Sequence, residues 1–475
     1  MADGDTGKHS PFLWRTPLSR RAFLASMAAA AAAATACDEG ALTKQTLPTP
    51  PRRPNVVLFF PDQEAVTRIP ANLNRPNFQR VFDSTVTFSH AYASHPLCCP
   101  SRATLFTGLY PHQAGMMYNI GLAGQFGPSL DATLPNLATV FQPAGYDVAH
   151  FGKWHLSKLD EVANYGFRPG DYWITPNQED GQNEDAETAQ RAAAWIRARS
   201  SDRPWLAVVS IINPHDILHP KTYTDIPARE VDLPDNFSDA ALSSDCPEIK
   251  GYAEALQRLV PADQDGWRQY LRAYFYLIER TDAQLGAVLD ALESTAQADD
   301  TVFIYTSDHG EMAASHQMVQ KSCLYEEAVR IPLHIRYPRL FSGHTESDLI
   351  VSNIDVVPTL LELTGVNWPT PLPGQSLKDV LTRDPLQYRD DVFVESNFPE
   401  VQSMQLGPTH MLRTRDWKYV AYQSGFEQLF DTTADPGETK DLARDSGEAS
   451  VLREMKERLN VWLEKTAAQS PPGAT

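Results

Sequence analysis

Cysteine is scarce in this sequence, with five residues in a chain of 475. Cys98 and Cys99 are adjacent and make poor partners for each other, while Cys37, Cys246 and Cys323 are scattered along the chain. This pattern excludes the small secreted scaffolds that are stapled by disulfides. We therefore expect the cysteines to matter through thiol chemistry and not through a disulfide framework.

Positive charge is also in short supply, because 41 Lys and Arg residues face 60 Asp and Glu residues, for a formal net charge of −19. Proteins that bind nucleic acids carry basic surfaces, so this deficit excludes binding to a phosphate backbone. The composition is otherwise ordinary, with 42% hydrophobic residues, and a chain of this length can bury a large core.

Long hydrophobic runs are lacking as well, and none approaches the roughly 18 apolar residues of a membrane helix. Residues 25–36 are nearly all alanine and follow the pair Arg20-Arg21. A positive flank, an apolar stretch and small residues predict a secretory signal over residues 1–36, with a surface Ala-rich helix as the alternative. Paired arginines followed by Phe-Leu resemble the twin-arginine signal, which exports folded proteins. We expect an exported protein, periplasmic or extracellular.

Residues 37–54 are rich in Thr and Pro and are expected to form a tether. The stretch Thr35-Ala36-Cys37 resembles a lipoprotein cleavage site, which would make Cys37 a lipid-anchored residue. Ala34 stands where Leu is usual in such sites, so cleavage without a lipid anchor stays open.

Four runs are apolar throughout, which is typical of strands buried on both faces of a sheet. They span residues 55–60, 147–151, 205–212 and 301–306. Helical patterns follow over residues 184–199, 267–294 and 356–364. Strands that alternate with helices predict an α/β fold, with a large mixed, mostly parallel sheet sandwiched by helices. We assign this α/β domain to residues 55–400.

The last part of the chain has a different pattern. Residues 411–422 and 427–430 are typical of short strands, and a helical pattern follows over residues 450–465. We expect a smaller C-terminal α+β subdomain over residues 401–475.

Charged or polar residues follow each apolar run at once. They are Asp62 and Gln63, then Lys153 and His155, then His215, and finally Asp308 and His309. In parallel sheets, ligands bind beyond the carboxyl ends of the strands. These residues therefore predict a functional site at that edge of the sheet.

The most specific stretch runs from Cys98-Cys99-Pro100-Ser101-Arg102 to Thr107-Gly108. It resembles the signature of the sulfatase family, in which Cys or Ser is followed by any residue, Pro, Ser and Arg, with Thr-Gly six positions beyond Ser. The resemblance makes Cys98 the first position, which a maturation enzyme oxidises to formylglycine (3-oxoalanine) in this family. One hydroxyl of the hydrated aldehyde attacks sulfur and the other then expels sulfate, whereas a sulfated thiol would be awkward to hydrolyse. Without the family pattern, the stretch would be a helix start with buried thiols.

Further motifs extend the resemblance over roughly residues 54–445, in family order. They are Gly152-Lys153-Trp154-His155, Asn213-Pro214-His215-Asp216, Ser307-Asp308-His309-Gly310-Glu311, Lys321 with residues 324–333, and Leu429-Phe430-Asp431 with residues 435–439. The resemblance implies catalytic roles for six residues. Lys153 and Lys321 would bind sulfate, Arg102 would hold and polarise the nucleophile, His155 would be the base that releases sulfate, and His215 would be the general acid, a role shared with Lys321.

The resemblance also implies one divalent metal ion, bound by Asp62, Gln63, Asp308, His309 and the modified Cys98. Many sulfatases have two consecutive Asp at the first strand end and Asn after the later Asp, where this chain has Gln63 and His309. These changes lower the number of carboxylates and add nitrogen. We expect Ca²⁺, with Mn²⁺ as the alternative.

We therefore predict a sulfatase that hydrolyses a sulfate monoester, of a small molecule or a carbohydrate, to an alcohol and inorganic sulfate. Gln and His variants also occur in branches that include choline sulfatases and phosphonate monoester hydrolases, so a phosphonate monoester or phosphodiester hydrolase is the enzymatic alternative. A surface-anchored binding protein that retains the fold is the alternative without enzyme activity, motivated by Cys37.

Overall fold

The computed structural model describes residues 52–467, apart from residues 121–126, 220–222, 260, 383–387 and 398–407. The expected signal over residues 1–36 and the expected lipid-anchor site at Cys37 lie outside the described residues. From Arg53 onward the chain forms one compact unit. In the described part of the chain, no helix is both long enough and apolar enough to cross a membrane.

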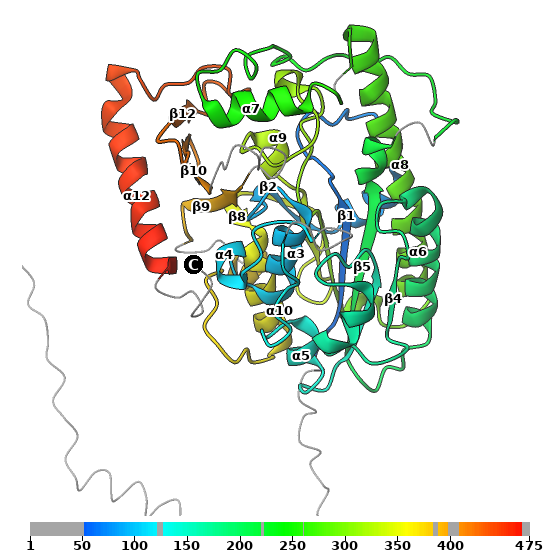
Figure 1. The fold of residues 1–475 in the computed structure, drawn as a ribbon. Helices are drawn as coiled ribbons and strands as arrows, with labels where there is room; N and C mark the ends of the chain where they lie inside the picture. The colour runs from blue at the N-terminus through cyan, green and yellow to red at the C-terminus, as the bar shows by residue number, and fades with distance from the viewer. Residues whose placement is uncertain are drawn as a thin grey trace, which may run out of the picture. The chain divides into compact units, whose positions relative to one another are not determined.

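A mixed sheet of eight strands forms the centre of this unit (Figure 1). The strands are β1 (Asn55–Asp62), β2 (Val86–Tyr92), β3 (Asp147–Gly152), β4 (Tyr172–Ile174), β5 (Trp205–Pro214), β6 (Thr301–Thr306), β7 (Leu333–Arg336) and β8 (Thr345–Ser352), in the order β4-β3-β5-β1-β6-β7-β2-β8. All pairs are parallel except β6 with β7 and β7 with β2. The four predicted apolar runs are the adjacent strands β3, β5, β1 and β6, so the expected mixed, mostly parallel sheet is confirmed.

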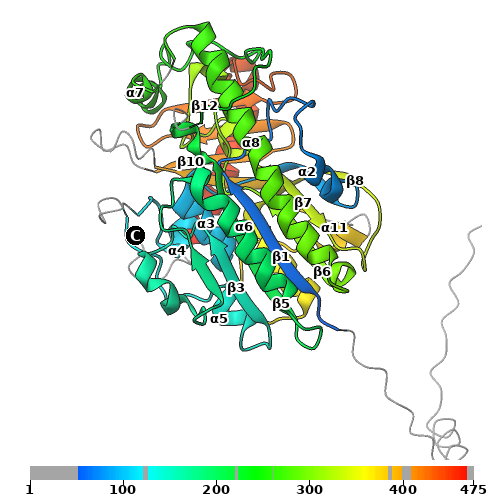
Figure 2. The same cartoon turned by 90° about the vertical axis from the view of Figure 1, so that its right-hand side faces the viewer.

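Helices cover both faces of this sheet. Successive side chains of a strand point to opposite faces, so a strand that is apolar throughout packs against helices on both sides. The helices are α6 (Gly181–Arg197) and α8 (Gln264–Glu293) on the first face, and α3 (Cys98–Thr107), α5 (Leu137–Phe141) and α10 (Val356–Thr364) on the second. Val57 and Phe59 of β1 lie in the core beneath α6 and α8, while Val56, Leu58 and Phe60 lie in the core beneath α3, α5 and α10. Figure 2 shows α6 and α8 running side by side over the strands.

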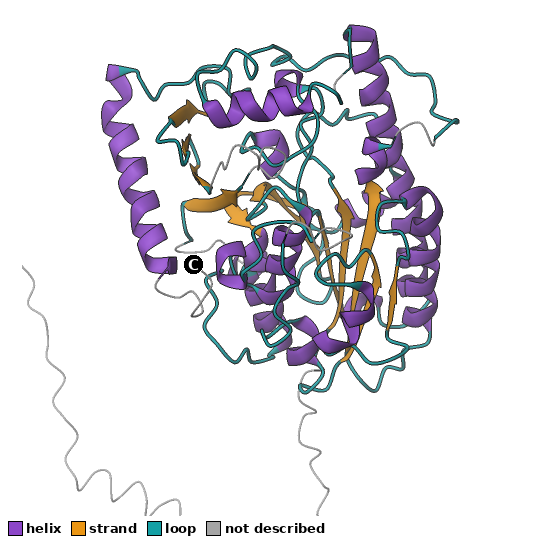
Figure 3. Cartoon of the chain, in the orientation of Figure 1, coloured by secondary structure: helices purple, strands orange, loops and turns teal. Residues whose placement is uncertain are grey.

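A second, smaller sheet lies near the C-terminal end of the chain (Figure 3). Its antiparallel strands are β9 (Asp391–Ser396), β10 (Thr409–Thr414), β11 (Trp417–Ala421) and β12 (Glu427–Asp431), and α12 (Ala449–Ala467) packs against it. Leu412, Tyr419 and Leu429 form the core beneath α12. The expected C-terminal α+β part of the fold is confirmed. Its first strand begins at Asp391, because Val392 and Val394 alternate into a buried core.

Shorter helices connect these parts. They are α2 (Pro76–Phe82), which packs against α8, and α4 (Pro111–Ala114), α7 (Pro247–Leu256), α9 (Glu326–Val329) and α11 (Lys378–Thr382).

A buried ion-pair cluster joins the small sheet to the large one at Glu326, the first residue of α9. The Glu326 carboxylate lies 3.1 Å from Arg413 Nε of β10 and 3.2 Å from Lys418 Nζ of β11, and it accepts a hydrogen bond from Tyr92 Oη. Burial raises the pKa of Glu326, but Arg413 and Lys418 outweigh burial and hold the pKa well below its usual value. The ionised form of Glu326 therefore stabilises the contact between the two sheets.

Replacing Glu326 with Gln is expected to lower the free energy of unfolding by about 3 kcal/mol or more, because Arg413 then stays buried without its carboxylate, while Lys418 keeps only its ion pair with Glu438. A lowered pKa in the folded state means that this stabilisation is present above about pH 4.5, the ordinary pKa of the carboxyl, and is lost as the pH falls toward the folded-state value. Urea unfolding at neutral pH and at about pH 3 measures both effects. The variant should be less stable at neutral pH and should lose less stability on acidification than the wild type.

The matched control is Glu454→Gln, since the Glu454 side chain is 69% exposed. It should leave stability nearly unchanged. Equal stability of the Glu326 variant and the wild type would show that the cluster does not hold the sheets together.

Candidate active site

Four neighbouring strands bring charged side chains to one edge of the large sheet. β1 ends at Asp62, β3 is followed by Lys153, β5 ends just before His215, and β6 is followed by Asp308 and His309. These strands are parallel and adjacent, so their carboxyl ends lie together. The structure thus gathers the residues that the sequence analysis singled out at the strand ends.

Cys98 is the first residue of α3, and its thiol is fully buried at the same place. Its Sγ lies 3.3 Å from His309 Nε2 and 3.7 Å from Asp62 Oδ1. Burial and Asp62 raise the pKa of the Cys98 thiol, but Lys321, Lys153 and His309 outweigh them and hold the pKa well below its usual value. Positive surroundings and a helix N-terminus are the environment of a reactive cysteine.

The neighbouring Cys99 has the opposite environment. Burial raises the pKa of its thiol, and its Sγ accepts a hydrogen bond from the backbone N–H of Ile120. Of the two adjacent thiols, only Cys98 faces the strand-end residues with a lowered pKa. This agrees with the predicted reading frame of the motif.

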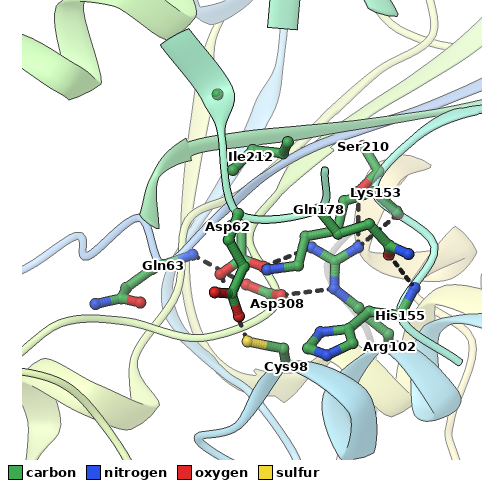
Figure 4. A network of polar contacts seen from close by, with 12 residues as sticks. Asp62, Gln63, Cys98, Arg102, Lys153, His155, Gln178, Ser210, Ile212 and Asp308 are labelled. Atoms are coloured by element: carbon green, nitrogen blue, oxygen red, sulfur yellow. Dashed lines mark hydrogen bonds and ion pairs between the residues drawn. The ribbon is translucent and has the colours of Figure 1, made fainter. Parts of the chain in front are cut away.

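Arg102 lies one helical turn after Cys98 and connects the strand ends (Figure 4). Its Nε donates to Asp308 Oδ2 at 2.9 Å and its Nη2 to Asp62 Oδ2 at 2.8 Å. Its Nη1 donates to the Lys153 carbonyl and to Ser210 Oγ. The fully buried guanidinium therefore holds the two carboxylates in place. Its predicted role in polarising the nucleophile remains a prediction.

The side chains of Asp62, Cys98, Asp308 and His309 form a candidate metal centre. Their ligand atoms all lie within 4.8 Å of one another, and all four residues are buried. Burial and, after it, repulsion by the neighbouring Asp62 carboxylate raise the pKa of Asp308 to about 6. A cation among them would remove this repulsion.

The chemistry of this donor set fits a divalent cation. Two carboxylates supply hard oxygen ligands, and imidazole nitrogen is accepted by several transition metals. His309 Nδ1 lies 3.0 Å from the Gly310 carbonyl, which can only accept a hydrogen bond. One proton of His309 is therefore on Nδ1, and Nε2 faces Asp62 and Asp308, where the neutral form would offer its lone pair to a cation.

Gln63, the other predicted ligand, points its side chain elsewhere. Its amide nitrogen donates to Glu311, and its amide oxygen accepts from Lys321 Nζ. Its contact with the carboxylates of the candidate metal centre is a 3.0 Å hydrogen bond from its backbone N–H to Asp308 Oδ1. In Figure 4 its side chain extends away from the carboxylate of Asp62.

The two predicted sulfate-binding lysines have different partners. Lys153 is fully buried with its Nζ 2.9 Å from Asp62 Oδ2, so it is paired with a carboxylate. Lys321 is 4% exposed and donates to the neutral amide of Gln63. Both lysines lower the pKa of Cys98 and of His215, which shows that they face the same centre.

Both predicted catalytic histidines have a lowered pKa; His215 is buried, whereas His155 is half-buried. Burial and Lys153 lower the pKa of His155, and burial, Lys153 and Lys321 lower the pKa of His215 to about 3. His155 has a positive φ of 54°, and its loop is held by Gln178, whose side-chain oxygen accepts the backbone N–H groups of Trp154 and His155. A neutral imidazole can accept a proton, as predicted for His155.

Several contributors were not found by sequence reasoning. Gln178 accepts a hydrogen bond from the backbone N–H of His155, and Ser210 accepts one from Arg102. Tyr270 of α8 donates a hydrogen bond to Glu311. None belongs to a motif, so only the fold brings them to the site. Glu311 was part of the Ser307–Glu311 motif, which gave it no role.

The comparisons with known proteins agree with this geometry. A family model described as Sulfatase matches residues 54–366, and one described as N-sulphoglucosamine sulphohydrolase, C-terminal matches residues 314–465. The first match covers more than half of the chain, so it shows the family.

Relatives and a solved structure point the same way. A Delta 4,5-hexuronate-2-O-sulfatase of Bacteroides thetaiotaomicron is 29% identical over 401 residues, covering 80% of this chain and 82% of the relative. An N-acetylglucosamine-6-O-sulfatase of the same species is 26% identical over 498 residues, covering 88% and 87%. The structure of a 2-O GAG sulfatase matches with a TM-score of 0.76 at 26% identity, over 88% of this chain and 93% of that one.

The predicted family, fold and enzyme class, a sulfuric ester hydrolase, are thus confirmed. The alternative of a binding protein without activity loses support, because the nucleophile position and both lysines are present. This chain belongs to the sulfatase family.

Proposed function

We propose that this sulfatase hydrolyses the sulfate monoester of a carbohydrate to the free alcohol and inorganic sulfate, with residue 98 as the source of the nucleophile. The observation that carries the proposal is the position of Cys98. Its Sγ lies beside His309 and Asp62, in a buried centre whose positive charge comes from Lys153, Lys321 and Arg102.

The two lysines would bind the sulfate group as point charges. Arg102 would act by holding Asp62 and Asp308, since its hydrogen bonds go to both carboxylates. A buried, preorganised set of charges stabilises the negative oxygens of a reacting sulfate without reorganisation.

We propose that a formylglycine-generating enzyme oxidises Cys98, because the family signature begins at this residue. The hydrated aldehyde supplies a hydroxyl nucleophile together with a second hydroxyl on the same carbon. His155 is neutral at pH 7 and can accept the proton of that second hydroxyl when sulfate is released.

His215 is proposed to protonate the leaving alcohol. Lys153 and Lys321 lower its pKa, and a bound sulfate group between these lysines would offset their charge and raise the pKa again. His215→Ala should therefore lower kcat/KM by about 10²- to 10⁴-fold for a sugar sulfate, whose alkoxide is a poor leaving group. For nitrophenyl sulfate, whose nitrophenolate group leaves without being protonated, the loss should be within about tenfold. Equal losses for both esters would remove His215 from the role of general acid.

We propose that Asp62, Asp308, His309 and residue 98 hold one divalent cation, with Ca²⁺ expected and Mn²⁺ as the alternative. When bound, the cation polarises the sulfuryl oxygens and holds the nucleophile. Removal of the metal with a chelator should abolish turnover, and Ca²⁺ should restore it. Restoration by Mn²⁺ alone would overturn the assignment of Ca²⁺.

The carbohydrate substrate is proposed from two named relatives, a hexuronate-2-O-sulfatase and an N-acetylglucosamine-6-O-sulfatase. A panel of 2-O- and 6-O-sulfated sugars, choline sulfate and a phenylphosphonate ester tests it by kcat/KM. A sulfated sugar should be the best substrate, and dominant turnover of the phosphonate would favour the phosphonate monoester hydrolase alternative.

Export to the periplasm or to the outside of the cell, with or without a lipid at Cys37, remains our proposal for the location of this protein.

A further inference from the structure

Gln63 lies between a buried anion and a buried cation. Its side-chain oxygen accepts a hydrogen bond from Lys321 Nζ, and its side-chain nitrogen donates to Glu311 Oε2. An ammonium group can only donate and an ionised carboxylate can only accept, so the orientation of the amide is determined by its two partners. Gln63 is fully buried, and both ends of its amide are engaged.

Glu311 is itself fixed by groups that carry no positive charge. Its Oε1 accepts hydrogen bonds from Tyr270 Oη at 2.7 Å, from the backbone N–H of Gln320 at 2.7 Å and from that of Ala313 at 3.3 Å. Across the described residues, no lysine, arginine or histidine forms an ion pair with Glu311. Glu311 also attracts Lys321 through space, but its hydrogen-bond connection to the ammonium group runs through the amide of Gln63.

The segment that carries Lys321 has an unusual backbone. Non-glycine residues with positive φ precede it, at Ala313, Ala314, His316 and Gln317, and also flank it, at Gln320 and Ser322. Such conformations cost free energy and persist only where surrounding contacts hold them. Two of those contacts are the hydrogen bonds from Ala313 and Gln320 to Glu311. Glu311 thus supports both the segment and, through Gln63, the ammonium group at its tip.

We propose, on the basis of the sulfatase function above, that Gln63 is a positioning residue for Lys321 and is not a metal ligand. Lys153 is paired directly with the Asp62 carboxylate, which offsets its charge. A neutral amide holds Lys321 in place and leaves its positive charge available to a sulfate group. The Asp that many sulfatases have at this position would place a carboxylate beside Lys321 or the metal. This chain instead separates the two tasks: Asp62, Asp308 and His309 face the metal, and Gln63 holds the lysine.

Two measurements on the matured holoenzyme test the proposal. The first is the metal content per chain of Gln63→Ala, beside Asp308→Asn as the variant that should lose the metal. The second is a double-mutant cycle with Gln63→Ala, Lys321→Ala and the double variant, followed by kcat and KM for a sulfate ester. Because Gln63→Ala leaves a buried cavity, Gln63→Glu, which keeps the shape, is measured in parallel.

We expect Gln63→Ala to keep its metal and to lose about 10- to 100-fold in kcat/KM, and we expect the same substitution to cost less than about threefold in the Lys321→Ala background. Gln63→Glu should also keep its metal, with KM raised because the new carboxylate offsets the charge of Lys321 and faces the Glu311 carboxylate in place of the donating amide nitrogen. Loss of metal from either Gln63 variant would make Gln63 a ligand and overturn the proposal. Equal losses of kcat/KM in both backgrounds would overturn it too. If the wild type turns over no sulfate ester, the proposed function fails, while the metal content still decides whether Gln63 is a ligand.

Discussion

Replacing Cys98 with Ala is expected to reduce sulfate-ester hydrolysis by about 10⁴-fold or more, since losses of this size follow removal of an attacking nucleophile. The thiol of Cys98 is the one that lies beside Asp62 and His309 and has a lowered pKa, and it starts the sulfatase signature. An Ala side chain cannot be converted to an aldehyde and supplies no hydroxyl. Turnover of nitrophenyl sulfate by purified variant and wild type measures the loss.

Cys99→Ala is the matched control, because Cys99 is equally buried and differs by one position. Its thiol has a raised pKa and accepts a hydrogen bond from the backbone N–H of Ile120. This variant should keep activity within a few-fold, and both variants should unfold in urea near the wild-type midpoint. Retained activity in Cys98→Ala would refute the nucleophile assignment, and equal inactivation of both variants would point to a disturbed α3.

Asp62→Asn is expected to lose bound metal and to lower kcat/KM by about 10³-fold, a loss of the size found when a preorganised charge in an active site is removed. Asp62 is the centre of the site: its carboxylate contacts Arg102, Lys153, Cys98 and His309. Neutralising it removes one hard oxygen ligand and leaves Lys153 buried without its counter-charge. The second effect should also lower the free energy of unfolding by about 3 kcal/mol.

Glu64→Gln is the control for Asp62→Asn, because Glu64 is the next buried carboxylate along the chain. It pairs with Arg75 at 2.9 Å and accepts from Tyr305 Oη, outside the metal donor set. It should destabilise the fold by a similar amount and keep the metal. Elemental analysis of metal per chain separates the two variants, and an Asp62→Asn protein with full metal content would refute the proposed ligand set.

The fold was predictable where strands are buried on both faces. β1, β3, β5 and β6 are apolar from end to end because helices cover both sides of them, and such runs are visible in a sequence. β7 has four residues and the first half of β8 is exposed, so neither produces a long apolar run. The antiparallel strand β7 and the edge strand β8 were therefore not predicted, whereas the parallel centre of the sheet was.

The site was predictable where a residue lies in a motif or at a strand end. Asp62, Cys98, Arg102, Lys153, His215 and Asp308 meet these conditions, and the fold gathers them. Gln63 also lies at a strand end, but the direction of its side chain depends on Glu311 and Lys321, which are far away in sequence. Gln178 holds the His155 loop by accepting backbone hydrogen bonds, which another side chain with an acceptor oxygen at that point of the fold could also accept. Such contacts leave no pattern in the sequence.

The central claim is that residue 98 is a formylglycine nucleophile at a metal centre, and mass spectrometry of the peptide that contains Cys98 tests it most directly. The peptide is isolated from protein that hydrolyses sulfate esters, and Cys99 in the same peptide serves as an internal reference. We expect the mass of an aldehyde at position 98, its reaction with a hydrazine reagent, and an unmodified thiol at position 99. An unmodified Cys98 thiol in fully active protein would contradict the claim.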